Sequence, residues 1–557
     1  MIRAVLPAIA VAMPWAAAQD LMPRELPGTG AAVLRFEAAP DVHGWAADDS
    51  PIVLERLESL VVTGDQPGRE PVTIGSVRLE RMSVGGLESL AAELSEWIGR
   101  PLTEVGLDRL TEVVLRHYDD RDRPMNEIWI PPQSGEGGVL HVELVEGRVG
   151  AVAVETLRHF NSDLLGSGMR LRQGDLLRTS DMQSELDWLS RNPFRQAELF
   201  VAPGEGVSAD LMIRMNERRP WRVYAGYDNS GSESVGENRY FAGFNWGNGF
   251  GLDQVIGYQF TMGDSLDVFQ AHSVSWEIPV HPWRGFFRLS GAWAEVSSID
   301  TQAGLQVNAD GTSWQVGLLY GAPLPRVGDW RHEVRGGVEF KRADNFVIFG
   351  QTSLPQNEVD VVQFRGEWQG NGSLWGGRAE AKAELVASPG GITDRNNRTQ
   401  FQAFRTGADP EYIYGRIEGS WVRPLPAGWS CRVHGIGQLA SGALLPTEQL
   451  GLGGHQTVRG YAERVYLADS GYAISAELRT PAWSPSAGSL GRLPLQGLVF
   501  LDHGRGWRES EGAQTLTSIG IGARAALGAY GSARLDVGWG LEDGQGAEIH
   551  GGVTLWY

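Results

Sequence analysis

The chain has 557 residues, a formal net charge of −20 at pH 7 and one cysteine, Cys431. This length predicts two or more domains, and a single cysteine excludes a disulfide within the chain. The Lys and Arg residues are not clustered and no Cys/His spacing typical of zinc is present, which argues against nucleic-acid binding and against a metal site.

The N-terminus predicts a secretory signal peptide over residues 1–18. Arg3 supplies the positive charge, residues 4–15 are mostly apolar, and three alanines at 16–18 form a small-residue cleavage site before Gln19. The apolar stretch is too short to span a bilayer, and no later run of about 18 apolar residues exists. A helical membrane protein is therefore excluded, whereas a soluble periplasmic protein and a β-barrel both stay open.

Residues 19–70 are interpreted as a linker or N-terminal segment with at most a short ordered element at 52–62. The segment lacks a regular apolar pattern and is interrupted by five prolines, Pro23, Pro27, Pro40, Pro51 and Pro67.

Residues 71–149 and 150–218 predict two copies of one small α/β domain. In the first copy Leu87, Leu90 and Leu94 recur at helical spacing, and a second helix is expected at 107–118. Strand-like segments at 72–79, 127–130 and 140–144 complete the order β-α-α-β-β. Residues 150–218 repeat this order, which indicates an internal repeat of about 70 to 80 residues.

From residue 219 onward the helical periodicity is replaced by alternation. In residues 285–294, Phe287, Leu289 and Trp293 share one face, whereas Arg288 and Ser290 lie on the other. Apolar residues outside and polar residues inside are typical of the strands of a membrane β-barrel. About 16 such segments occur over residues 219–557, and an even number is expected of bacterial barrels. The predicted fold is thus an all-β transmembrane barrel of antiparallel strands, preceded by two small α+β domains.

The connections between these segments alternate in length, as short periplasmic turns and long outer loops do. Short ones are expected at 247–251, 280–285, 323–329, 424–429 and 528–531, and long ones at 228–238, 299–311, 342–359, 388–411 and 441–470. The connection at 481–495 departs from the rule because it is long on the short side. A soluble β-sandwich gives no reason for this alternation.

The chain ends inside its last predicted strand. Val553, Leu555 and Tyr557 share one face of that strand, and the final ring is expected at the bilayer interface. A terminal strand of this kind is natural where it must close a barrel.

Several short motifs together resemble the transporter component of two-partner secretion, the haemolysin secretion/activation type. Residues 130–149 are similar to the end of that family's first POTRA domain, and residues 191–204 are similar to part of its second. Residues 219–221, 227–231 and 247–248 resemble its first barrel strands. The resemblance covers nearly everything after residue 70, and it implies POTRA domains at 71–149 and 150–218.

Two motifs in the barrel region are the most specific part of the resemblance. The family's loop motif is matched by Val458, Arg459, Gly460 and Tyr461, and its strand motif by residues 497–504, with Gly497, Phe500, Asp502 and Gly504. The resemblance implies that loop 441–470 folds into the lumen. Asp502 has lumen-facing parity if Val499 and Leu501 face lipid, and an arginine inside a barrel needs a carboxylate. We therefore expect an ion pair between Arg459 and Asp502.

The resemblance implies an outer-membrane transporter that binds a large secreted exoprotein in the periplasm and passes it unfolded through the barrel. It implies no cofactor, no metal and no nucleotide hydrolysis. Outer-membrane lipid and the barrel assembly machinery are the other expected partners, and nucleic acid is not. An outer-membrane protein insertase of the same superfamily and a passive porin stay open as alternatives. An insertase favours more than two POTRA domains, and a porin has no reason to carry any.

An enzyme is not expected. The glycines at 247–251 precede no helix, so they do not form a phosphate-binding loop. Asp502 and His503 are neighbours on a strand and point to opposite faces, so they cannot act together.

Overall fold

The computed structural model describes residues 33–36 and 50–557, except 67, 156, 233–234, 303–304, 350–351, 354–356, 487–491, 510–511 and 543–545. The predicted signal peptide lies outside these residues. The described chain forms two compact units, one that ends at Arg218 and one that begins at Arg219.

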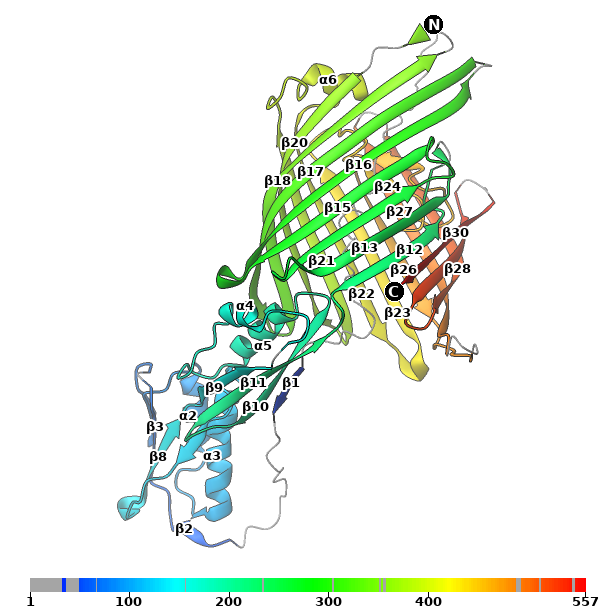
Figure 1. Cartoon of the computed structure of the whole chain (residues 1–557). Coiled ribbons are helices and arrows are strands. Elements are labelled where there is room, and N and C mark those ends of the chain that lie inside the picture. The colour runs from blue at the N-terminus through cyan, green and yellow to red at the C-terminus, as the bar shows by residue number, and fades with distance from the viewer. Residues whose placement is uncertain are drawn as a thin grey trace. The chain divides into compact units, whose positions relative to one another are not determined.

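The first unit begins with a five-stranded sheet of order β4-β5-β3-β8-β7, on which two helices pack (Figure 1). The elements are β2 (Ile52–Leu54), β3 (Ser59–Gly64), β4 (Val72–Ile74), β5 (Val77–Glu80), α2 (Leu87–Ser95), β6 (Leu102–Thr103), α3 (Glu104–Asp119), β7 (Glu127–Trp129) and β8 (Val139–Val145). The apolar positions expected to share a helix face, among them Leu90, Leu94, Leu110 and Val114, are fully buried in one core.

Strand β3 corrects the boundary expected at residue 71. It lies in the middle of the sheet and pairs in parallel with both β5 and β8, so the first α/β domain includes residues assigned to the linker. The short ordered element expected at 52–62 covers β2 and the first four residues of β3, but it was assigned to the linker rather than to the domain. The segment expected as one strand at 72–79 is a hairpin of β4 and β5, which turns at Gly75 with φ 57°.

The second α/β domain has the expected β-α-α-β-β order. It contains β9 (Arg148–Val154), α4 (Ser162–Ser167), α5 (Thr179–Leu189), β10 (Arg195–Pro203) and β11 (Ser208–Glu217). Strand β1 (Val33–Phe36) adds to the outer edge of β10 in parallel, from Val33 opposite Glu198 to Phe36 opposite Val201. Thus the sheet has the order β1-β10-β11-β9. None of the helices in the described part of the chain is long and apolar enough to cross a membrane.

The second unit is a closed antiparallel barrel of 16 long strands. They are β12 (Trp221–Asp228), β13 (Arg239–Gly249), β14 (Gln254–Met262), β15 (Phe269–Val280), β16 (Gly285–Gln302), β17 (Leu305–Val327), β18 (Trp330–Phe349), β20 (Asn357–Leu374), β21 (Gly377–Pro389), β22 (Glu411–Pro424), β23 (Ser430–Ala440), β26 (Ser470–Arg479), β27 (Leu495–Arg508), β28 (Gly512–Ala526), β29 (Gly531–Gly540) and β30 (Ala547–Trp556). The two residues of β19 (Thr352–Ser353) pair with the end of β18.

The barrel is inverted relative to a soluble protein, because its apolar side chains are exposed and its charges are buried. On β27, Val499 and Leu501 are each 52% exposed, whereas Asp502, which points to the opposite face, is 0% exposed. Apolar side chains on the outer face and polar side chains toward the lumen are the arrangement typical of a membrane barrel.

Two expected long loops are strands in the structure. Strands β16 and β17 remain paired as far as Gln302 and Leu305, and β18 pairs with β20 as far as Asn345 and Asn357. The expectations of loops at 299–311 and 342–359 were therefore wrong. Outside the bilayer a strand needs no lipid-facing apolar row, so the alternation on which the strand prediction depended fades there. Figure 1 shows these hairpins extending past the neighbouring strands.

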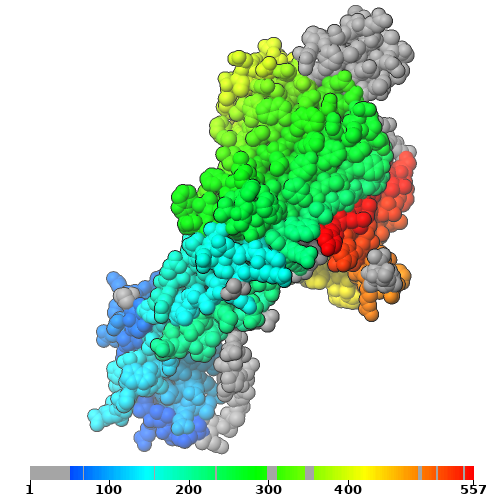
Figure 2. Space-filling model, in the orientation of Figure 1, coloured from blue at the N-terminus to red at the C-terminus, as the bar shows by residue number. Residues whose placement is uncertain are grey.

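The barrel closes between its first and last strands. Strand β30 pairs with β12 from Trp556 opposite Tyr224 to Gly552 opposite Asp228, and Figure 2 shows the last strands, in red, directly against the first ones, in green. The backbone of Tyr557 exchanges two hydrogen bonds with Val223, at 3.0 and 3.2 Å. Because the ladder is closed, the wall has no free strand edge in the membrane.

Candidate functional site: the inward loop and its anchor

The loop between β23 and β26 turns back into the barrel. Within it, β24 (Leu450–Leu452) and β25 (Tyr466–Ala468) form a short antiparallel pair. Leu452, Val458 and Tyr461 are buried in a cluster with Ala473 of β26 and Leu516 of β28. The loop therefore packs against the inner wall, and its tip carries the motif at 458–461.

Arg459 lies at the centre of a buried ion-pair network. Its Nε donates to Asp502 Oδ2 at 2.8 Å and one Nη donates to Asp502 Oδ1 at 2.8 Å, so the pair is bidentate. The other Nη donates to Glu477 Oε1 at 2.8 Å and to Asp536 Oδ1 at 3.3 Å. Ser475 Oγ accepts the remaining guanidinium hydrogen at 2.9 Å. All five guanidinium donors are thus used, which lysine could not reproduce.

The rest of the strand motif supports this contact. The Phe500 ring lies 3.6 Å from the guanidinium carbon of Arg459, a cation–π geometry. The backbone N–H of Arg459 donates to Asp502 Oδ2 at 3.0 Å, which fixes the loop backbone as well as its side chain. The Arg459 side chain is 4% exposed and that of Asp502 is 0% exposed.

Glycines allow the loop tip to lie directly on the wall. Gly460 has φ 99°, a backbone conformation that other residues rarely adopt. A Cβ on Gly538 of β29 would meet the Gly460 nitrogen at 2.6 Å and the Arg459 carbonyl carbon at 2.7 Å. A Cβ on Gly504 would meet Val458 Cγ2 at 2.9 Å. Gly538 and Gly460 are therefore required for this close approach of the loop backbone to the wall.

Tyr461 anchors the tip to a fourth strand. Its hydroxyl donates to Glu542 Oε2 at 2.5 Å and lies 3.1 Å from the Thr517 carbonyl oxygen. Thr517 belongs to β28, so the four-residue motif contacts β26, β27, β28 and β29 in turn.

The remaining expected site residues lie elsewhere. Gly497 is outside the anchor, where its N–H donates to Thr480 Oγ at 3.0 Å. Val553 and Leu555 belong to the closing ladder, opposite Tyr227 and Ala225. The Tyr557 ring is 69% exposed, and its centroid lies 5.9 Å from that of Trp221.

The sequence analysis missed the other members of the network. Glu477 and Asp536 were not identified, nor were the three further arginines that neutralise them: Arg479 pairs with Glu477 at 2.6 Å, Arg524 with Asp536 at 3.0 Å, and Arg432 with Glu477 at 3.9 Å. The available signal was that Glu477 on β26 and Asp536 on β29 occupy alternating positions that face the lumen. The four arginines and three carboxylates are close to balanced, as buried charges must be.

The network can hold a loop, but it has no arrangement for covalent chemistry. Its carboxylates are all occupied by arginines. Among the residues that the structure describes, no group of three or more His, Cys, Asp or Glu is placed to hold a metal ion.

Comparison with known proteins gives consistent results. Residues 208–525 match the model of the haemolysin secretion/activation protein ShlB/FhaC/HecB family. The chain is 21% identical over 483 residues to the outer membrane transporter CdiB of Dickeya dadantii (strain 3937), which covers 84% of this chain and 82% of that protein. It is 23% identical over 454 residues to the hemolysin transporter protein ShlB of Serratia marcescens, with 76% of each chain covered.

Among solved structures, CdiB from Escherichia coli is similar with a TM-score of 0.74 over 94% of this chain and 93% of that chain, at 17% identity. At this identity the likeness concerns the fold alone. It supports the assignment of the barrel and of the domains that precede it.

Proposed function

We propose, because the chain belongs to the haemolysin secretion/activation protein family, that it captures one large exoprotein in the periplasm and passes it unfolded through its barrel. The chain is an outer-membrane transporter of the two-partner secretion type, and the family consists of transporters rather than enzymes. The observation that carries the proposal is the loop anchored inside a closed barrel by Arg459 and Asp502. A passive porin has no reason to carry two α/β domains.

Capture of the partner is assigned to the sheet edges of the α/β domains. In the second domain, β10 already accepts β1 as an added parallel strand over four residue pairs. In the first domain, β7 is an edge strand with Trp129 51% exposed. An extended segment of the partner would add to such an edge through its backbone, so recognition would not depend on a folded partner.

Translocation is assigned to the barrel lumen without nucleotide hydrolysis. A chain that folds after leaving the lumen on the outer side lowers its free energy, and the folded chain cannot return through the lumen. The inward loop occupies part of the lumen and must shift for a chain to pass. The Arg459 network is the contact that this shift would break.

Two finer partner assignments belong to the same proposal. The exposed apolar side chains of the barrel, such as Val499 and Leu501, would contact outer-membrane lipid. The last strand, with Val553, Leu555 and Tyr557, would be the segment handled by the barrel assembly machinery. Nothing in the charge distribution calls for nucleic acid.

Deletion of the first α/β domain tests capture. A variant lacking residues 50–145 should leave the barrel assembled but release no partner into the medium, because the ladder of the barrel is closed without that domain. Heat-modifiability on gels reports the barrel, and mass spectrometry of the culture medium reports the partner. Normal release by the shortened protein would remove this domain from the capture step.

A further inference from the structure

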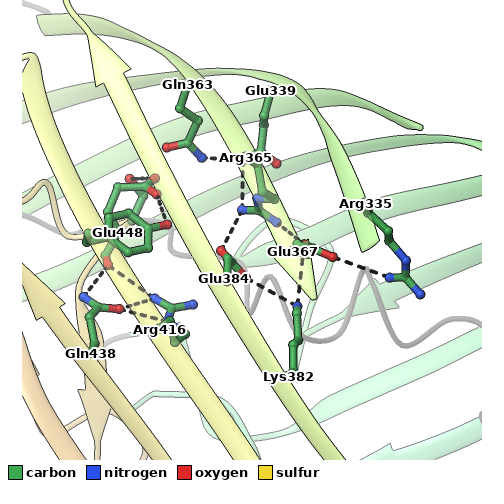
Figure 3. Close-up of polar contacts among 12 residues, drawn as sticks. Arg335, Glu339, Gln363, Arg365, Glu367, Lys382, Glu384, Arg416, Gln438 and Glu448 are labelled. Atoms are coloured by element: carbon green, nitrogen blue, oxygen red, sulfur yellow. Dashed lines mark hydrogen bonds and ion pairs between the residues drawn. The ribbon is translucent and has the colours of Figure 1, made fainter. Parts of the chain in front are cut away.

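A second buried ionic cluster lies on the wall away from the Arg459 network. Arg365 of β20 pairs with Glu339 of β18 at 3.2 Å, with Glu384 of β21 at 3.5 Å and with Glu367 at 3.4 Å. Lys382 bridges Glu367 at 3.7 Å and Glu384 at 3.3 Å. Figure 3 shows Arg365 between Glu384 and Glu367, with Lys382 beside both carboxylates. These contacts join neighbouring strands of the wall to one another.

One member of this cluster belongs to the loop. Glu448, whose side chain is 1% exposed, accepts from Lys341 Nζ of β18 at 2.8 Å and from the Tyr414 hydroxyl of β22 at 3.0 Å. Its backbone carbonyl accepts from Gln438 of β23 at 3.0 Å and from Arg416 of β22 at 3.4 Å. Figure 3 shows Glu448 beside Gln438 and Arg416.

The loop is therefore held by two sets of wall residues. Its tip is held on β26, β27 and β29 through Arg459, and its stem on β18, β22 and β23 through Glu448. In the order of the barrel, β23 of the stem anchor pairs with β26 of the tip anchor, but no residue named in one anchor belongs to the other. Release of one contact need not release the other.

The charges of the stem anchor are not equivalent. Lys341 also pairs with Glu339 at 3.4 Å, so loss of the Glu448 charge leaves the lysine a carboxylate partner. Loss of the Lys341 charge instead leaves Glu448 with hydroxyl donors, from Tyr414 and Thr447, and with the more distant charge of Arg365. A buried carboxylate that loses its hydrogen-bonded counter-charge is strongly destabilised.

We propose that Glu448 is a second anchor of the inward loop, a positioning residue that holds the loop stem on the wall independently of Arg459. The loop tip can then leave its site while the stem stays docked. This deepens the proposed function, since it rests on the loop governing passage through the lumen.

The test follows loop position directly, with two cysteine reporters in full-length protein that carries Cys431→Ser. Leu445→Cys reports the stem, because Leu445 is 2% exposed and its carbonyl accepts the Glu448 N–H at 2.8 Å. Ser518→Cys reports the tip, because Ser518 is 0% exposed on β28 and a Cβ on Gly460 would lie 3.0 Å from it. The rate of labelling by a membrane-impermeant maleimide is measured in detergent micelles, without any partner.

In the stem reporter, Lys341→Met should raise the labelling rate by roughly tenfold or more, and Glu448→Gln should raise it less. The double variant Lys341→Met/Glu448→Gln should return to the rate of Glu448→Gln, since the unpaired carboxylate is gone. The tip reporter should change in none of them. Arg459→Ala should do the reverse, exposing the tip reporter and sparing the stem reporter.

Lys382→Met is the matched control, since it removes one cation of the same cluster that bridges Glu367 and Glu384 of the wall. It should leave the stem reporter unchanged. The anchor is refuted if Lys341→Met leaves the stem reporter unchanged, if Lys382→Met has the same effect, or if both reporters always rise together. Heat-modifiability separates these outcomes from misfolding. Because no partner is present, a failure of export would not alter the labelling result.

Discussion

Arg459 contacts three carboxylates, so its removal should disturb the network more than removal of Asp502. Removal of Asp502 leaves the guanidinium two carboxylates, Glu477 and Asp536. Removal of Arg459 takes the central cation from all three. A simple ion pair would make the two alanine variants equivalent, whereas this network makes them differ.

Arg459→Ala should impair export and alter pore conductance more than Asp502→Ala, and the double variant should resemble Arg459→Ala. Loss of one partner of a truly buried pair costs about 3–5 kcal/mol, and the effects of residues in one network are not additive. Export at matched membrane levels and conductance in planar bilayers measure the effect. Equal defects in the single variants that multiply in the double would show that the residues act separately.

The glycine contact gives a second residue-scale prediction. Gly538→Ala should displace the loop tip as Arg459→Ala does, because its Cβ would overlap the Gly460 backbone. Gly366→Ala on β20 is the control, since a Cβ there meets nothing within 4 Å. Conductance of both variants in planar bilayers is the measurement. Wild-type conductance of Gly538→Ala would mean that the tip tolerates a shift of this size.

At the scale of single elements, α3 should respond to pH through His117. Burial lowers the pKa of His117 below its ordinary value of 6.5, with Arg121 adding to the effect, while its Nε2 lies 3.1 Å from the Gly85 carbonyl. The unfolded chain thus binds more protons than the folded domain just below pH 6.5, so stability is complete above that pH and declines as the pH falls. Amides of α3 should lose protection from hydrogen exchange at pH 5.5 relative to pH 7.5, after correction for intrinsic exchange.

His117→Gln is the test of this assignment, because glutamine keeps an N–H donor for Gly85 and does not titrate. The loss of protection at low pH should be smaller in the variant. An unchanged pH dependence would assign the effect to another group.

Helices and strands were predictable where apolar residues recur at one regular spacing. The 16 barrel strands follow from alternation alone, since lipid on one side demands apolar residues at every second position. The same reasoning failed for residues 299–311, where a strand has left the bilayer and alternation is no longer required. It also failed for the boundary of the first domain, because the local pattern of β3 does not say that it pairs with β5 and β8.

Contacts between elements were predictable only in part. Asp502 could be paired with Arg459 from strand parity and a resemblance in motifs. Glu477, Asp536 and Glu448 could not, because their contacts depend on which strands the loop reaches across the lumen. Strand parity can place Glu477 and Asp536 in the lumen, but neither parity nor local pattern says which lumen residues the loop contacts.

At the scale of the whole molecule, the closed hydrogen-bond ladder of the barrel wall provides stability, and the inward loop is the part that can move. The wall keeps all its backbone hydrogen bonds if the loop shifts, so a change at the loop need not cost the fold. Partner capture and passage are then separable from barrel integrity. This is the property that an exporter needs and that a passive pore does not.

Comparison of culture media tests the export of one partner most directly. A strain lacking this protein, the same strain complemented with it, and the strain complemented with Arg459→Ala would be compared by quantitative mass spectrometry of medium and outer membrane. The account predicts that one large protein disappears from the medium, returns on complementation and returns poorly with Arg459→Ala, while the outer membrane keeps its composition. An unchanged medium together with a loss of other barrels from the outer membrane would contradict it and would indicate an insertase.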